Sequence, residues 1–236
     1  MQNIKTLSNL KLRAGYGLTG NQDIGNLNSV STFDNSGGAN LGGTTLIGQA
    51  PTRIANPDLK WESTAQFNVG IDAGLWDNRL TLTIDYFRKN TKDMLLNLPV
   101  SATTGFTTQL TNIGSIENSG WEFLAESRNF TGRFNWTTTV NFATLKNTVE
   151  DIGPLDQILT GSLPFTSEIT VIQPGSPLSA YYGYQVTGVF QKNDDIAHSA
   201  QPTAKPGYLR FQDINGDNKI DAKDRGVIGN PLPEFT

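Results

Sequence analysis

The longest regular pattern in the chain covers residues 61–89, where apolar and polar residues alternate one by one. The alternation runs through residues 64–75 and resumes at 80–86, after a turn predicted at 76–78. Successive side chains of a strand point to opposite faces, so the pattern predicts a β-hairpin with one apolar and one polar face. Residues 64–75 exceed the usual strand of about 5–6 residues and match the roughly 9–11 residues that cross a bilayer at a slant. Strand length therefore indicates a membrane.

Three further segments repeat the alternation: residues 10–19, 121–126 and 134–142. In the first of them Lys11 and Arg13 share a face, opposite Leu10 and Leu12. A Lys or Arg that faces lipid near the bilayer midplane costs about 2–4 kcal/mol. The two cations are therefore expected to face a polar interior.

The links between these strands alternate strictly in length. Residues 20–59 and 90–112 show no sustained period, whereas the links at 76–78 and 129–132 are short and turn-like. Outer-membrane barrels combine short periplasmic turns with long extracellular loops, and soluble sandwiches keep most connections short. The same assignment places Trp61 near the outer rim and Trp76 and Trp136 beside periplasmic turns, where interfacial aromatic residues gather.

The predicted fold class is all-β: an antiparallel transmembrane β-barrel segment with short periplasmic turns and long extracellular loops. Residues 1–147 would hold five membrane strands and two long loops. Residues 148–231 would form a large extracellular loop region, and residues 232–236 would start the next barrel strand. A closed barrel needs about eight strands or more, so we expect an internal part of a larger barrel.

Composition changes this picture little. A negative mean hydropathy and the lack of an apolar run near 18 residues exclude a transmembrane helix, but alternating barrel strands also average out to polar. The absence of cysteine excludes a disulfide framework and a thiolate metal site. With a net charge of −4 and no cluster of Lys and Arg, the chain lacks the basic face that binds nucleic acid.

The acidic segment at residues 213–224 carries oxygen ligands at the spacing of a calcium loop of EF-hand type. It departs from that pattern at Asp224, where Glu is usual, and at Asn218, where Gly is usual, and no flanking helices are evident. The alternative is a turn whose Asx side chains bond the backbone. We expect a structural Ca²⁺, and no other cofactor, with these ligands: Asp213, Asn215, Asp217, the Lys219 carbonyl, Asp221 and Asp224.

The remaining candidates are aromatic, luminal and catalytic residues. Tyr181, Tyr182 and Tyr184 could stack on a sugar ring or a partner, or form the small core of their own loop.

His198 lies in a polar segment, and Glu117, Glu122 and Glu126 lie partly on one polar face. A glycosidase with paired carboxylates is conceivable, but charge on a lumen explains them more simply, so we predict no enzyme. The predicted lumen is lined by Lys11, Arg13, Gln66, Asn68, Asp72, Asn135 and Asn141.

Five segments resemble, in order, signatures of the SusC/RagA family of TonB-dependent outer-membrane transporters: LKLRAGYGLTGNQ (10–22), NPDLKWE (56–62), NSGWE (118–122), DINGDNKIDAKDR (213–225) and IGNP (228–231). The resemblance implies a multi-pass protein of a Gram-negative outer membrane, with a 22-stranded barrel and an internal plug. It also implies partners: the TonB complex, acting through regions outside this chain, membrane lipid, and a SusD-like surface lipoprotein that captures glycans or peptides. The alternative is a soluble, calcium-stabilised carbohydrate-binding module or adhesin, which would explain the aromatic residues and the acidic loop but not the alternating link lengths.

Overall fold

The computed structural model describes residues 6–23, 25, 27–35, 37–164, 166–233 and 235–236. Its contacts divide the chain into two compact units. The first unit comprises residues 1–146, 150–153 and 235–236, and the second comprises residues 147–149 and 154–234. No helix in the described part of the chain has the length and apolar character needed to cross a membrane.

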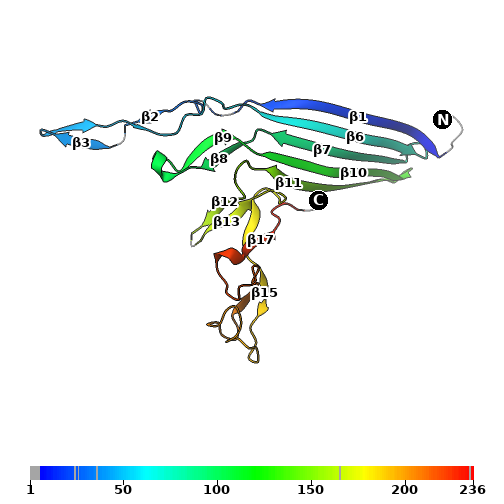
Figure 1. Cartoon of the computed structure of the whole chain (residues 1–236). Helices are drawn as coiled ribbons and strands as arrows, with labels where there is room; N and C mark the ends of the chain where they lie inside the picture. The colour runs from blue at the N-terminus through cyan, green and yellow to red at the C-terminus, as the bar shows by residue number, and fades with distance from the viewer. Residues whose placement is uncertain (1–5, 24, 26, 36, 165, 234) are drawn as a thin grey trace. The chain divides into compact units, whose positions relative to one another are not determined.

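The first unit is built on a five-stranded sheet of long strands (Figure 1). In spatial order the strands are β1 (Leu7–Asn21), β6 (Glu62–Leu75), β7 (Leu80–Lys92), β10 (Ser115–Thr131) and β11 (Asn135–Asp151). The pairs β1–β6, β6–β7 and β7–β10 are antiparallel. The predicted hairpin at residues 61–89 is therefore confirmed as β6–β7, within an all-β antiparallel fold.

Strand register separates the residues of this sheet onto two unlike faces. Leu12 lies opposite Ile71, which lies opposite Ile84, whereas Arg13 lies opposite Gly70, which lies opposite Asp85. The apolar face remains open to its surroundings: Leu12 is 72% exposed, and Leu18 is also 72% exposed. Since burial of apolar surface drives folding in water, such a face points to an apolar solvent.

The strands extend beyond the predicted segments. The segment predicted at residues 10–19 is β1 (Leu7–Asn21), that at 121–126 is β10, and that at 134–142 is β11. Alternation stops where both faces become polar, although backbone pairing continues. The short turn predicted at 129–132 lies instead at 132–134, so the prediction that Phe134 belongs to the returning strand was wrong. The Phe134 ring packs against Phe130, at 5.9 Å between centroids, and Trp136, at 6.5 Å.

The β6–β7 turn uses three consecutive residues with left-handed backbone. The φ angles of Trp76, Asp77 and Asn78 are 50°, 57° and 58°. The Asn78 side chain lies over Gly74, where an added Cβ would come within 2.0 Å of Asn78 Oδ1. Gly74 thus provides the room in which this turn closes without distorting β6.

The two long links contain short hairpins, which the absence of a sustained sequence period did not predict. The first link holds β2 (Phe33–Asp34) paired with β5 (Ala50–Pro51), and β3 (Gly38–Leu41) paired with β4 (Thr44–Ile47). The second link holds β8 (Leu95–Pro99), the short helix η1 (Ala102–Thr104) and β9 (Thr108–Asn112). The sequence did not reveal these strand pairs, because strands this short display too few positions to show a period of two.

The second unit contains a four-stranded sheet and a separate strand pair. The sheet order is β12 (Ile158–Leu163), β13 (Thr166–Ile172), β14 (Ala180–Tyr184) and β17 (Arg225–Gly229), and β15 (Val186–Val189) pairs with β16 (Leu209–Phe211). The helix η2 (Ala222–Asp224) precedes β17. The buried apolar residues of the second unit, among those described, are Val149, Ile158, Val171, Ala180 and Phe190.

The last two residues approach β11 in the first unit. Thr144 and Phe235 form an antiparallel bridge, and the N–H groups of Ala143 and Thr236 each donate to the other residue's carbonyl. Residue 234 lies outside the described residues, so a new barrel strand at 232–236 stays a prediction, as do the predicted domain boundaries at 147 and 231.

Candidate functional site

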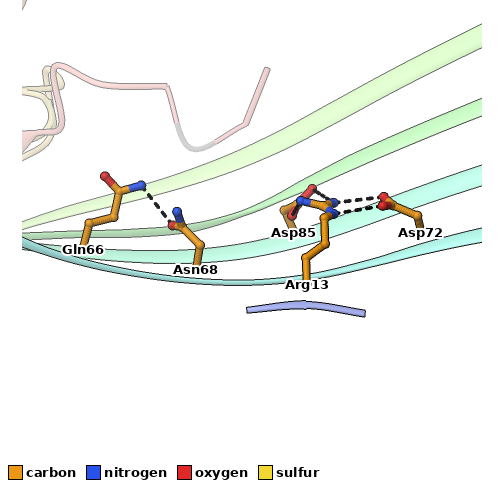
Figure 2. A network of polar contacts seen from close by, with 5 residues as sticks. All are labelled: Arg13, Gln66, Asn68, Asp72 and Asp85. Carbon is orange, nitrogen blue, oxygen red and sulfur yellow. Dashed lines mark hydrogen bonds and ion pairs between the residues drawn. The ribbon is translucent and has the colours of Figure 1, made fainter. Parts of the chain in front are cut away.

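A charged network lies at the centre of the sheet's polar face (Figure 2). The Arg13 guanidinium from β1 contacts both carboxylate oxygens of Asp72 from β6: Nε donates to Oδ2 at 2.9 Å, and Nη2 donates to Oδ1 at 3.0 Å. The same guanidinium donates to Asp85 Oδ2 from β7 at 2.9 Å. One cation therefore joins three strands, in the two-pronged geometry that guanidinium and carboxylate groups favour.

Gly70 makes this arrangement possible. It lies between Arg13 and Asp85 in the cross-strand row, on the strand that the guanidinium crosses. A Cβ at Gly70 would come within 2.1 Å of Asp85 Oδ1 and 2.8 Å of Arg13 Nη2. Because the three charged side chains are partly exposed, their pairing orders the polar face more than it stabilises the fold.

Further polar groups extend the network along the same face. Gln66 Nε2 donates to Asn68 Oδ1 at 3.1 Å (Figure 2), and Lys11 is the cross-strand partner of Asp72. A hollow of about 280 Å³ opens beside these groups. Its lining includes Arg13, Gln66, Asn68, Asp85, Phe87, Lys89 and Glu122.

The structure thus gathers Arg13, Gln66, Asn68 and Asp72, four of the residues predicted to line a lumen, with Lys11 beside Asp72. Asn141 lines a second hollow of about 360 Å³, together with Thr83, Asp85 and Glu122. Asn135 is the first residue of β11, next to the turn, and lines neither hollow. A luminal role for all of them stays a prediction.

Sequence reasoning missed the central position of Asp85 and Gly70. Asp85 falls on the polar face by simple alternation, but Arg13 is 72 residues away, so only the strand register brings the two together. Of the three carboxylates predicted to lie partly on one polar face, Glu117 lies on the other face, opposite Asn90, where it pairs with Arg88, whose Nε donates at 2.8 Å. Glu122 and Glu126 lie on the polar face, opposite Asp85 and Thr81.

In the acidic loop, carboxylates accept hydrogen bonds from backbone N–H groups. Asp213 accepts from Gly216 and Asn218, both at 2.7 Å, and Asp224 accepts from Ile214 at 2.9 Å and Asp221 at 2.8 Å. Asp224 is fully buried, and its pKa is lowered chiefly by the Asp221 N–H, with the Ile214 N–H adding to the effect. Since a hydrogen bond to the ionised form favours that form, the Asp224 carboxylate is ionised at neutral pH.

This geometry matches the Asx-turn alternative, and Asn218 adopts the left-handed conformation, with φ of 59°. Asp217 Oδ1 accepts from the Lys219 N–H at 3.0 Å, and Asp221 Oδ1 accepts from the Lys223 N–H at 2.9 Å. Among the described residues, no three His, Cys, Asp or Glu side chains are grouped to hold a metal ion. Calcium binding by this loop stays a prediction.

The three tyrosines of β14 have different surroundings. The Tyr182 ring lies under the Arg225 guanidinium at 4.6 Å, and the Tyr184 ring packs on Phe211 at 5.4 Å between centroids. Tyr181 is exposed. Tyr182 and Tyr184 thus pack within their own unit, while stacking on a ligand stays a prediction.

His198 is also exposed, with Nδ1 2.9 Å from both carboxylate oxygens of Asp195.

Comparisons with known proteins agree with this architecture. The sequence profile described as "TonB dependent receptor-like, beta-barrel" matches residues 5–225. TonB-dependent receptor P3 of Formosa agariphila is 34% identical, and TonB-dependent receptor SusC of Bacteroides thetaiotaomicron is 31% identical. These alignments cover 100% and 98% of the chain but 24% and 23% of the relatives, so the chain spans about a quarter of their length.

Solved structures give the same result. The RagAB peptide importer in its closed-closed state matches 99% of the chain and 25% of the solved chain, with a TM-score of 0.74 and 26% identity. A further structure of the RagAB peptide transporter matches 95% of the chain and 22% of the solved chain, with a TM-score of 0.70 and 26% identity. The chain therefore belongs to the family of TonB-dependent receptors, among its SusC- and RagA-like members, and its long strands are part of that family's β-barrel.

Proposed function

We propose that this chain forms part of the wall of an outer-membrane transporter that imports glycans or peptides together with a SusD-like surface lipoprotein. The single observation that carries the proposal is the contrast between the two faces of the five-stranded sheet. Exposed Leu12 and Leu18 lie on one face, and the Arg13–Asp72–Asp85 network lies on the other. Such a sheet suits a wall between lipid and a polar lumen.

Aromatic rings support the assignment of the apolar face to lipid. Centroids of Tyr86 and Trp121 are 5.0 Å apart, and Phe123 continues the band from Trp121 at 6.2 Å to Phe142 at 6.1 Å. At the opposite end of the apolar band, Trp76 lies in the β6–β7 turn and Trp136 lies next to the β10–β11 turn. Aromatic residues at both ends of an apolar band fit the two interfaces of a bilayer.

On the polar face we assign the side chains to passage of the cargo. Arg13, Asp72 and Asp85 hold one another in place, while Lys89 and Glu122 line the adjacent hollow. Groups of both signs, together with amides, can form transient hydrogen bonds with sugars or peptides that pass. We assign no chemical step to these groups, and the protein would act as a receptor and transporter instead of an enzyme.

Energy would come from the TonB complex, and capture of the cargo from the lipoprotein. The names of the relatives support the TonB part of the proposal, because they identify TonB-dependent receptors, and the RagAB structures, described as a peptide importer, support a peptide as one class of cargo. One of the relatives is the TonB-dependent receptor SusC, in agreement with the resemblance of the sequence to the SusC/RagA family. We therefore propose oligosaccharide or peptide as the cargo class.

Fractionation of the native bacterium tests the proposal directly. The full-length protein should remain with the outer membrane after a wash at high salt and alkaline pH, and detergent should release it. A strain that lacks the gene should lose uptake of the cargo, and plasmid-borne wild type should restore it. Recovery of the full-length protein in the aqueous fraction would instead favour the soluble extracellular module.

A further inference from the structure

The two long links of the first unit enclose a hollow of about 390 Å³. Residues 52–54, directly after β5, line one side, and residues 106–110, which include the first residues of β9, line the other. Figure 1 shows that these links lie beyond the end of the sheet opposite the 76–78 turn. The volume falls in the range of about 300–1,000 Å³ typical of ligand pockets.

Side chains fasten the two walls of this hollow to each other. Asn56 Nδ2 donates to the Leu110 carbonyl at 3.0 Å, and Gln109 Nε2 donates to the Ala55 carbonyl at 3.3 Å. Asn112 accepts from the Lys60 N–H at 2.6 Å and donates to the Lys60 carbonyl at 2.8 Å. Because amide groups bridge the links at several points, the hollow has a defined shape.

Arg53 is the cation of this hollow. It is half-buried, and its Nη1 donates to the amide oxygen of Asn28. Within the described ranges no carboxylate pairs with Arg53, in contrast to Arg13 and Arg88, which both have acidic partners. A guanidinium has donors that match the two oxygens of a carboxylate, so Arg53 has capacity for an anionic group of a ligand.

Neighbouring side chains supply a surface for the uncharged part of the same ligand. The Phe106 ring is half-buried at the edge of the hollow. Asn97, Thr107 and Thr108 also line it, and their side chains make no hydrogen bond within the part of the chain that the structure describes. An aromatic ring beside free hydroxyl and amide groups can bind either a sugar ring or a peptide backbone.

We infer that this hollow is a cargo subsite that binds a carboxylate group through Arg53. The inference rests on the proposed transport function and narrows its cargo to molecules that carry a carboxylate. Two sources share this chemistry: the carboxylate of a uronic acid in an oligosaccharide, and the C-terminal carboxylate of a peptide. Phe106 and the side chains of Asn97, Thr107 and Thr108 contact the part of the ligand next to that carboxylate.

Calorimetric titration of the full-length receptor in detergent tests the inference with two matched pairs of probes. The first pair is trigalacturonate and its methyl ester, and the second is trialanine and its C-terminal amide. The wild type should bind the charged member of one pair about tenfold more tightly than its neutral counterpart, as expected for a hydrogen bond to a charged group. The pair that shows this preference identifies the source of the carboxylate.

Variants separate the charge of Arg53 from its structural contact. Arg53→Gln keeps a donor for Asn28 but should abolish the preference for the charged probe, and Arg53→Lys should retain part of it. The control, Arg133→Gln in the β10–β11 turn, should behave as the wild type. Heat-modifiable mobility on gels verifies that each variant forms a barrel.

Equal binding of charged and neutral probes by the wild type, or no binding of any probe, would overturn the inference. So would a full preference in Arg53→Gln. None of these three results affects the proposed transport function, because membrane fractionation and cargo uptake are measured on the same receptor without these probes.

Discussion

Arg13 reaches Asp85 across an intervening strand because the residue between them, Gly70, has no side chain. The Arg13 guanidinium donates to Asp85 at 2.9 Å and also pairs with Asp72. In the row of paired residues that runs from β1 to β7, the cation of Arg13 and the anion of Asp85 therefore meet above Gly70. This relationship gives the polar face its fixed charge pattern.

Gly70→Ala should break the contact between Arg13 and Asp85 at a small cost in stability. The atoms in the way are the ends of side chains that can rotate, so we expect a loss of about 1 kcal/mol in the free energy of unfolding. In the Gly70→Ala background, Arg13→Ala should cost less than it does in the wild type. Denaturant unfolding of the full-length receptor in detergent measures both values.

The matched control for this cycle is Gly15→Ala, on β1 and on the same polar face. An added Cβ at Gly15 meets no atom within 4 Å. Its effect should simply add to that of Arg13→Ala. If Gly70→Ala also proved additive with Arg13→Ala, Gly70 would have no part in the network.

The sequence alone predicted the two-faced β6–β7 hairpin, because a residue period of two reports directly on the faces of a strand. It did not predict the strand ends. Beyond Tyr86 and Trp121, side chains such as Arg88 and Glu117 make the outer face polar while the backbone pairing continues. Hydrophobic alternation records where the apolar face ends, whereas backbone hydrogen bonds determine where the strand ends.

The candidate sites were predictable to different degrees for a similar reason. Arg13 and Asp72 fall on the polar face by alternation. They are 59 residues apart in the sequence, so their contact depends on the register between β1 and β6. The hollow around Arg53 depends on the packing of two links that have no sequence period at all. Local patterns assign a residue to a face, and only tertiary structure identifies its partners.

The stability of the loop at residues 213–224 should depend on acid pH through Asp224. Its folded-state pKa is lowered, so its contribution is complete above the ordinary Asp pKa of about 3.9 and is lost as the pH falls through the lower, folded value. The protection factors of the Ile214 and Asp221 amides, which correct hydrogen exchange for its intrinsic pH dependence, should therefore fall in acid. Asp224→Asn should remove this dependence, and the exposed control Asp195→Asn should keep it. Protection factors that stay constant down to strongly acid pH would contradict the assignment.

Calcium binding by the same loop is tested by calorimetric titration of the full-length receptor with calcium. We predict saturable binding that Asp217→Ala weakens, because Asp217 supplies one of the predicted ligands at the centre of the loop. Asp195→Asn, outside the loop, should bind as the wild type does. An absence of binding in both the wild type and Asp217→Ala would retire the calcium prediction and leave the Asx turns to hold the loop alone.

The central claim is that one face of the sheet contacts lipid and the other a polar lumen, and two adjacent residues of β6 test it most directly. Val69 lies on the apolar face opposite Ala14 and Tyr86, and Asn68 lies on the polar face opposite Gly15 and Phe87. Val69→Arg places charge in hydrocarbon at a cost of about 2–4 kcal/mol, whereas Asn68→Arg does not. The measurement is the fraction of full-length receptor that shows heat-modifiable mobility in outer membranes. We predict a large loss for Val69→Arg and little for Asn68→Arg, and equal effects of the two substitutions would contradict the account.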